Sequence, residues 1–214
     1  MPFTTSKTTN NRNIMNEPKL TIVLPYLSNS PCIDICKNFL KQNTVNEYEL
    51  IEIIDETDIY LAYNKGAHEA KYDTIVLLND DMFVSPGWDL PYVKFCKPKT
   101  VITGHLIESG RVPVNPVNFE YDCGRQPETF DYNKFINFIN TVTKEIPEVV
   151  ENVRGWYMPI AFHKSTFIDY PNYNKYPYPN DIDLIDKILP ILDFKFMQVN
   201  SFMYHLQNYT ATYA

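Results

Sequence analysis

The sequence predicts an α/β fold with a mainly parallel central sheet flanked by helices. Short apolar runs of strand length alternate with amphipathic segments of helix length through the first part of the chain. Strands and helices that alternate in this way build parallel sheets, because each helix carries the chain back across the sheet. With 214 residues, of which 44% are hydrophobic, the chain is long enough for one domain with a substantial core.

The first half of the chain carries the clearest pattern. An apolar, β-branched run that ends at a proline indicates a buried first strand, and a fully apolar run before an acidic pair indicates the third. The expected elements are a strand at Leu20–Pro25, a helix at Ile33–Gln42, a strand at Glu49–Ile54, a helix at Ile59–Ala70 and a strand at Thr74–Leu78.

The second half is less regular. A long segment rich in proline and asparagine indicates a lid or binding loop. The expected elements are a strand at Val101–Ile107, the long loop Glu108–Phe130, a helix capped by Asp131 that runs to Glu145, a helix opened by Asp181–Leu184, and a strand at Phe194–Tyr204.

The organisation that follows is a single domain. Residues 1–18 form a polar, asparagine-rich leader that we expect to be disordered, and residues 19–214 form the domain. Within it, residues 19–90 form the regular half and residues 91–214 the less regular half.

The charge and the cysteines exclude several classes of protein. The formal net charge is -7 without a cluster of lysine and arginine, which argues against binding to nucleic acid or to an anionic membrane. No signal peptide or membrane span is predicted. The four cysteines show no zinc spacing, and a reduced, cytoplasmic setting is expected.

Asn79-Asp80-Asp81, directly after the third predicted strand, is the strongest indication of chemistry. Ligands bind beyond the carboxyl ends of parallel strands. Paired carboxylates at such a position are costly unless a cation compensates them, and Mg²⁺ takes oxygen ligands together with substrate phosphates. The alternative is a turn that uses asparagine and aspartate for ordinary hydrogen bonds, and the local sequence leaves both open.

An ordered set of motifs resembles the family-2 type of glycosyltransferases with the GT-A fold. The set comprises Leu20–Tyr26, Glu49–Asp55, Tyr63–Ala70, Thr74–Asp81 with its DxD-like end, the turn Ser85–Trp88, and Asn180–Leu184, which is similar to the Glu-Asp-x-Asp-Leu segment of the family. The chain also resembles glycosyltransferase domains encoded by large DNA viruses of algae. Such domains are often one module of a larger polypeptide.

The resemblance implies a UDP-sugar donor, a glycan or glycoprotein acceptor, and Mn²⁺ or Mg²⁺ as the cofactor. It also implies that residues 19–90 are the nucleotide-binding half of the domain and residues 91–214 the acceptor-binding half. It implies that Asp81 and His205 bind the metal, although a lone histidine is more often structural. It also implies that Tyr26 stacks on the uracil ring and that Asp55 accepts a hydrogen bond from the N–H of that ring. Tyr26 and Trp156 have core positions as alternatives, and Asn64 has a role as a helix cap. The implied donor-binding residues are Pro25, Tyr26, Asp55, Asn64, Asn79, Asp80 and Trp156.

The resemblance also implies an inverting transfer with Asp181 as the general base. Asp183 is its rival, and Arg111, Arg125 and Arg154 are candidate partners of the diphosphate. Asn79 and Asn180 stand where the family has acidic residues. These departures favour an alternative, a non-catalytic nucleotide- or carbohydrate-binding module. A nucleotidyltransferase is disfavoured because the loop after the first strand lacks glycine and basic residues.

Overall fold

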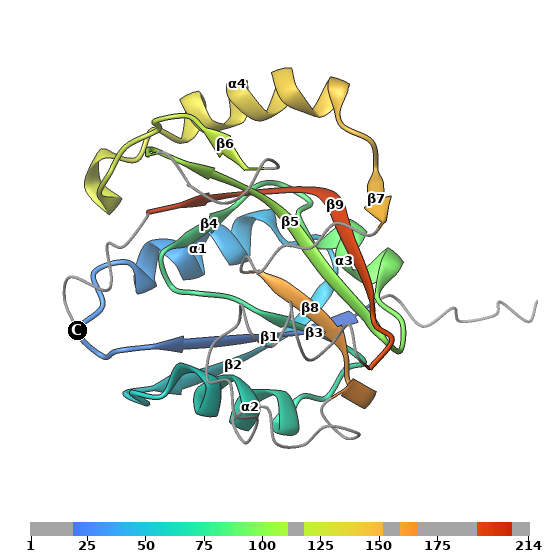
Figure 1. Cartoon of the computed structure of the whole chain (residues 1–214). Helices are drawn as coiled ribbons and strands as arrows, with labels where there is room; N and C mark the ends of the chain where they lie inside the picture. Colours follow the sequence, from blue (N-terminus) through green and yellow to red (C-terminus); the bar gives the residue numbers. More distant parts are fainter. Residues whose placement is uncertain (1–18, 111–117, 152–158, 167–191, 207–214) are drawn as a thin grey trace, which may run out of the picture.

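The computed structural model describes residues 19–110, 118–151, 159–166 and 192–206, which build one mixed sheet with helices on both faces (Figure 1). The strand order is β2-β1-β3-β8-β5-β9-β4, with β6 paired to β5 and β7 paired to β9. The strands are β1 (Lys19–Tyr26), β2 (Glu47–Ile54), β3 (Thr74–Leu77), β4 (Met82–Val84), β5 (Thr100–Glu108), β6 (Phe119–Glu120), β7 (Val149–Glu151), β8 (Ile160–His163) and β9 (Lys195–His205).

The strand directions confirm a mainly parallel sheet. Strands β1, β2, β3, β5, β6 and β9 run one way, whereas β4, β7 and β8 run against them. Because β1, β2, β3, β5 and β9 share one direction, their carboxyl ends lie at one edge of the sheet, on the left in Figure 1. This edge is called the carboxyl edge below.

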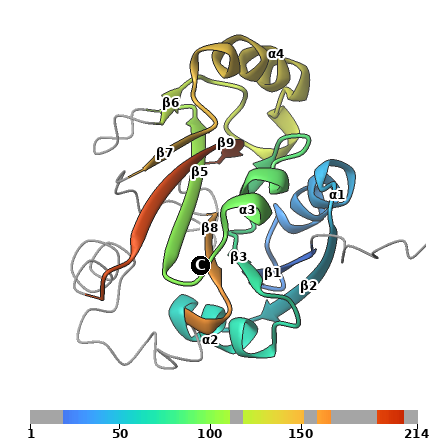
Figure 2. The ribbon, with the colours of Figure 1, turned by 90° about the vertical axis from the view of Figure 1, so that its right-hand side faces the viewer.

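The helices cover both faces of the sheet. Helices α1 and α2 lie on opposite sides of β1 and β2, and α4 lies beyond β6 (Figures 1 and 2). Gly66 permits α2 to approach the sheet, since a Cβ atom there would lie 2.3 Å from Cγ1 of Val23. The helices are α1 (Ile33–Asn43), α2 (Ile59–Glu69), α3 (Asp89–Phe95) and α4 (Tyr132–Val142), with 3-10 turns η1 (Pro127–Thr129) and η2 (Thr143–Glu145).

Two helices begin at aspartate caps. The carboxylate of Asp131 accepts a hydrogen bond from the backbone N–H of Lys134 at 2.9 Å, which confirms the predicted start of α4. Asp58 caps α2 by accepting from two backbone N–H groups of the first turn, at 3.0 and 3.1 Å. The interpretation of Asn64 as a helix cap is therefore wrong, because Asn64 lies inside α2.

The second half departs from the expected elements in places. The segment Glu108–Phe130, expected to be a loop, contains β6 and the turn η1 within its described part. Strands β4 and β7 have three residues each, too few to produce a readable alternation. Helix α3 begins Asp89-Leu90-Pro91. A proline usually indicates the absence of a helix, so α3 is hard to recognise from the sequence, although the first turn of a helix accommodates proline.

The core lies on both faces of the sheet and is dominated by aliphatic and aromatic side chains. All four cysteines have free thiols. None of the described helices is both long enough and apolar enough to cross a membrane. The largest fully buried side chains are Trp88, Tyr63, Tyr92, Tyr204, Phe83, Phe135 and Phe162.

Candidate active site at the carboxyl edge

The candidate site lies where the parallel strands end. Asp81 connects β3 to β4, Glu108 is the last residue of β5, and His205 is the last residue of β9. The strand register places His205 opposite Glu108 on one side and Met82 on the other. Side chains from distant parts of the sequence therefore meet at one point of the carboxyl edge.

In this array the imidazole of His205 lies between two carboxylates. Its Nδ1 atom lies 2.5 Å from Oε1 of Glu108, and its Nε2 atom lies 3.5 Å from Oδ2 of Asp81. The side chain of each carboxylate is only 4% exposed, and that of His205 is 18% exposed. Because Glu108 engages one ring nitrogen, it fixes the orientation of the ring and directs the other nitrogen toward Asp81.

The charges of this array compensate one another. Burial by itself lowers the pKa of His205, but the charge of Asp81 and the hydrogen bonds with Asp81 and Glu108 outweigh it and raise that pKa to about 10. A positive group between two buried carboxylates offsets the cost of removing them from water. Within the described part of the chain, no group of three or more His, Cys, Asp and Glu side chains is arranged to hold a metal ion by itself.

Asp80 has a different partner from Asp81. Its Oδ2 atom accepts a hydrogen bond from the hydroxyl of Ser30, whose oxygen in turn accepts from the backbone N–H of Cys32 at 3.2 Å. Burial raises the pKa of Asp80 to about 6, while the bond from Ser30 opposes this shift and the charge of Asp81 adds to it. Asp80 thus anchors the loop between β1 and α1.

Tyr26 and Asp55, the predicted base-binding residues, lie side by side at the ends of β1 and β2. The backbone N–H of Asp55 donates to the carbonyl of Tyr26 at 3.0 Å, and its Oδ1 atom accepts from the backbone N–H of Ser28 at 2.7 Å. The hydroxyl of Tyr26 donates to Oε2 of Glu52 at 2.7 Å, which holds the half-buried ring in place. Pro25 is buried inside β1.

Asn79 and Asn64 are both linked to α2. The hydroxyl of Tyr63 donates a hydrogen bond to Oδ1 of Asn79, which immediately precedes the acidic pair and is half-buried. Asn64 follows Tyr63 in α2 and is also half-buried. The remaining predicted site residues, namely Asp181, its rival Asp183, Trp156, Arg111 and Arg154, lie outside the described residues.

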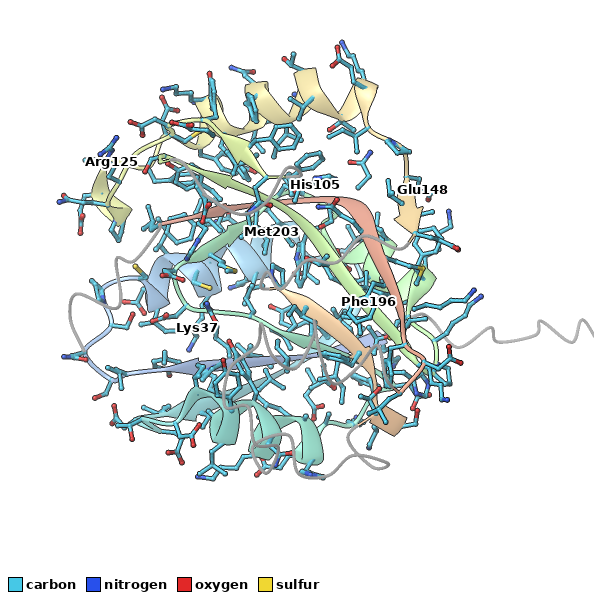
Figure 3. All side chains as sticks on the ribbon, viewed as in Figure 1. Lys37, His105, Arg125, Glu148, Phe196 and Met203 are labelled. Atoms are coloured by element: carbon cyan, nitrogen blue, oxygen red, sulfur yellow. The ribbon has the colours of Figure 1, made fainter. Side chains whose placement is uncertain are left out.

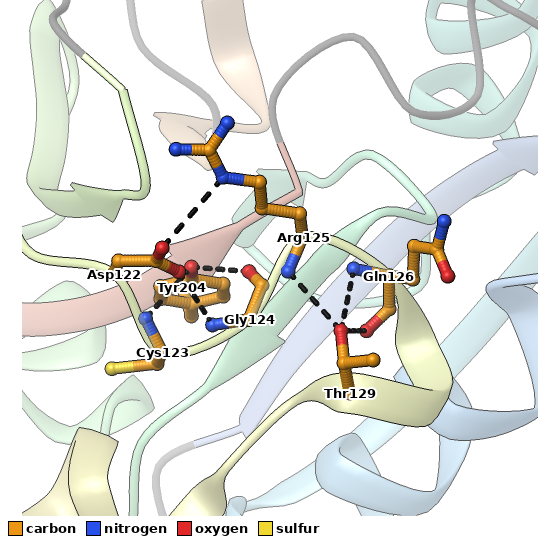
Figure 4. A network of polar contacts seen from close by, with 7 residues as sticks. All are labelled: Asp122, Cys123, Gly124, Arg125, Gln126, Thr129 and Tyr204. Atoms are coloured by element: carbon orange, nitrogen blue, oxygen red, sulfur yellow. Dashed lines mark hydrogen bonds and ion pairs between the residues drawn. The ribbon is translucent and has the colours of Figure 1, made fainter.

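Tyr204, next to the histidine that ends β9, holds the loop that carries Arg125 (Figure 4). The hydroxyl of Tyr204 accepts a hydrogen bond from the backbone N–H of Cys123 at 3.0 Å and donates one to the carbonyl of Gly124 at 2.5 Å. Gly124 has a φ of 123°, a conformation that favours glycine. A strand residue thereby fixes the path of the neighbouring loop.

Of the three candidate arginines, Arg125 is the one that lies within the described residues. Figure 3 shows it at the end of the molecule where the parallel strands finish, whereas Glu148 and Phe196 lie toward the other end. Its guanidinium pairs with Asp122 at 3.6 Å, and both side chains are more than half exposed. Such an exposed pair is weak, which leaves the cation able to change partners.

Sequence reasoning missed Glu108 and Tyr204. Glu108 carries the same signal as the acidic pair, an acidic residue directly after an apolar run, but the proline- and asparagine-rich sequence that follows it predicts the beginning of a loop. The role of Tyr204 left no signal in the sequence, because its partners are backbone groups far away along the chain. Gly124, for example, lies 80 residues before it.

Replacing Tyr204 by phenylalanine is expected to lower the free energy of unfolding by about 1–3 kcal/mol, because it removes a buried hydroxyl that bonds two backbone groups. Urea denaturation measures this change. The matched control is Tyr121→Phe on the same loop, whose half-buried ring stacks on Phe138 and whose change should stay within about 0.5 kcal/mol. Equal losses in the two variants would show that the Tyr204 hydroxyl does not hold the loop.

No protein-family model matches this sequence, and no curated protein matches it. The structure, however, is similar to the crystal structure of GalNAc-T7 with UDP, GalNAc and Mn²⁺. The TM-score is 0.59 at 11% sequence identity, and the match covers 89% of this chain and 44% of that chain. The chain has a GT-A fold.

At this identity the similarity concerns the fold alone. The GT-A fold expected from the ordered motifs is confirmed, whereas membership of family 2 and a viral origin stay predictions. The chain spans less than half the length of GalNAc-T7. Within the GT-A fold, the carboxyl edge described above is the place where α/β sheets bind their ligands.

Proposed function

We propose that the chain is a metal-dependent, inverting glycosyltransferase that moves a sugar from a UDP-sugar to a hydroxyl group of a glycan or glycoprotein. The observation that carries this proposal is the array of Asp81, His205 and Glu108 at the carboxyl edge. The similarity of the fold to that of GalNAc-T7 with UDP and Mn²⁺ supports it independently.

The residues present fit a divalent cation. Mg²⁺ and similar ions in nucleotide sites need only one or two protein ligands, since waters and substrate phosphates supply the rest. Asp81 offers a carboxylate oxygen. His205 offers Nε2 once the cation has displaced the proton that the two carboxylates hold on the imidazole, because a ligating histidine must be neutral. Imidazole suits Mn²⁺ better than Mg²⁺. A metal-ligating histidine is commonly oriented by a carboxylate that engages its other ring nitrogen. Glu108 occupies that position relative to His205. When bound, the cation neutralises charge on the departing diphosphate.

The loop between β1 and α1 forms the wall for the donor base. Asp80 anchors this loop through Ser30 and Asp55 anchors it through Ser28, so the loop is held in place before the donor binds. The ring of Tyr26 stacks on uracil. Asp55 accepts the N–H of the base, since a carboxylate that accepts from one backbone N–H retains further acceptor sites.

Asp181 is proposed to act on the acceptor. It takes the proton from the acceptor hydroxyl while that oxygen forms a bond to the anomeric carbon from the face opposite the diphosphate. The bond from the anomeric carbon to the diphosphate breaks in the same step, UDP leaves, and the anomeric configuration inverts. A base of this kind contributes about 10²–10⁴-fold to the rate.

A non-catalytic nucleotide- or carbohydrate-binding module on a transferase scaffold is the second candidate. The observation that favours it is the side chain at position 79, which is an asparagine engaged by Tyr63 where the related family often has a carboxylate. Such a module would bind the donor but transfer nothing.

The test is release of UDP from a panel of UDP-sugars with Mn²⁺ and candidate acceptors, with and without EDTA. We expect release that requires the metal, that disappears in Asp181→Asn, and that persists in Asp73→Asn, an exposed aspartate before β3 at the opposite edge. UDP binding without turnover of any pair would favour the module. Absence of any Mn²⁺-assisted affinity for UDP would refute both the transferase and a nucleotide-binding module.

A further inference from the structure

We propose that Tyr63 is a positioning residue that orients the amide of Asn79 toward the nucleoside diphosphate of the donor. This inference rests on the proposed function. Tyr63 is 1% exposed, and its hydroxyl donates a hydrogen bond to Oδ1 of Asn79 from the α2 side of the sheet. No motif of the sequence assigned a function to Tyr63.

The hydrogen bond decides which end of the Asn79 side chain is left for a ligand. Its carbonyl oxygen accepts from Tyr63, so the Nδ2 group is the remaining end and carries two N–H donors. An N–H donor complements an oxygen acceptor. Of the parts of a UDP-sugar, the ribose and the diphosphate present such oxygens at the edge where the adjacent acidic pair lies.

The neighbouring charges explain why a donor suits position 79. Asp80 and Asp81 are 7% and 3% exposed, and a third carboxylate beside them would add repulsion and would repel a diphosphate. An amide fixed with its N–H groups toward the ligand adds attraction without adding charge. Asn79 is therefore more than a weakened form of a metal-binding aspartate.

The packing of α2 makes Tyr63 suitable for this purpose. Gly66, one turn later, lets the helix lie directly against Val23 of β1. The phenol ring is consequently enclosed in the core and reaches the carboxyl edge only with its hydroxyl. A side chain held in this way loses little conformational freedom when the ligand binds, which favours affinity.

The experiment is calorimetry of UDP with Mn²⁺ on the full chain, together with KM and kcat for UDP release. We expect Tyr63→Phe to raise the Kd for UDP and the KM for the donor by about 5–20-fold with a smaller change in kcat. Asn79→Ala should have a similar effect, and the double variant should bind no more weakly than Asn79→Ala alone.

The control is Tyr92→Phe, because Tyr92 is equally buried and its hydroxyl donates to the carbonyl of Pro159 at 3.1 Å. It should leave the affinity for UDP unchanged. If folded Tyr63→Phe binds UDP as the wild type does, or if the effects of Tyr63→Phe and Asn79→Ala add, this inference is wrong while the proposed function stands. Wild-type protein without Mn²⁺-assisted affinity for UDP would overturn both.

Discussion

Replacing Asp81 by asparagine is expected to lower the Mn²⁺-assisted affinity for UDP by more than about 100-fold. The reason is that Asp81 supplies the charged oxygen next to Nε2 of His205, whereas loss of a group that only supports a ligand costs about 10–100-fold in metal affinity. Calorimetric titration of UDP at fixed Mn²⁺, compared with titration in EDTA, measures the effect.

Other variants of the same array are expected to lose metal affinity to different extents. Glu108→Gln should weaken Mn²⁺ binding by about 10–100-fold, because Glu108 holds His205 without facing the cation. His205→Ala should resemble Asp81→Asn, and His163→Ala, at the opposite edge of the sheet, should bind as the wild type does. A folded Asp81→Asn variant with undiminished Mn²⁺-assisted affinity for UDP would refute a metal site at this array.

Replacing Asp89 by alanine is expected to lower the free energy of unfolding by about 3–5 kcal/mol. Asp89 in α3 is 0% exposed, and its carboxylate accepts hydrogen bonds from the backbone N–H groups of Val45 and Asn46 at 3.0 and 2.8 Å and from Nδ2 of Asn46 at 2.6 Å. Its loss would leave a cavity at a fully buried position and would deprive three partly buried donors of their acceptor. Since the free energy of unfolding of a domain is about 5–15 kcal/mol, the variant would lose a large part of its stability.

Urea denaturation followed by circular dichroism tests this prediction. Asp89→Asn keeps one acceptor oxygen and should lose less than Asp89→Ala. Asp34→Ala serves as the control, since Asp34 is an exposed acidic residue in the first turn of α1 and should cost less than about 1 kcal/mol. Similar midpoints for Asp89→Ala and Asp34→Ala would show that this buried carboxylate does not join α3 to the turn before β2.

The first half of the fold could be predicted because its signals are local. Five successive elements, from β1 to β3, begin and end within a few residues of their expected positions. The buried strands are continuous apolar runs, and α2 starts beside an aspartate that caps it. These patterns depend on neighbours in sequence, so no tertiary information is needed to read them.

The second half could not be predicted in the same way. Strand β8 lies between β3 and β5 and runs against both, a position that follows from pairing with partners far along the chain. The register of β9 against β5 shifts at Gly104, where a Cβ atom would lie 2.7 Å from the carbonyl oxygen of Ser201. Nothing near Gly104 in sequence indicates that contact.

At the candidate site, local patterns in the sequence indicate an acidic pair after a buried strand and a histidine at the end of the last strand. The contacts of these side chains appear only in the folded chain, where Asp81 faces His205, Asp80 bonds to Ser30 instead, and Glu108 completes the array. Strand order and register place these side chains, and both result from long-range packing that no local pattern encodes.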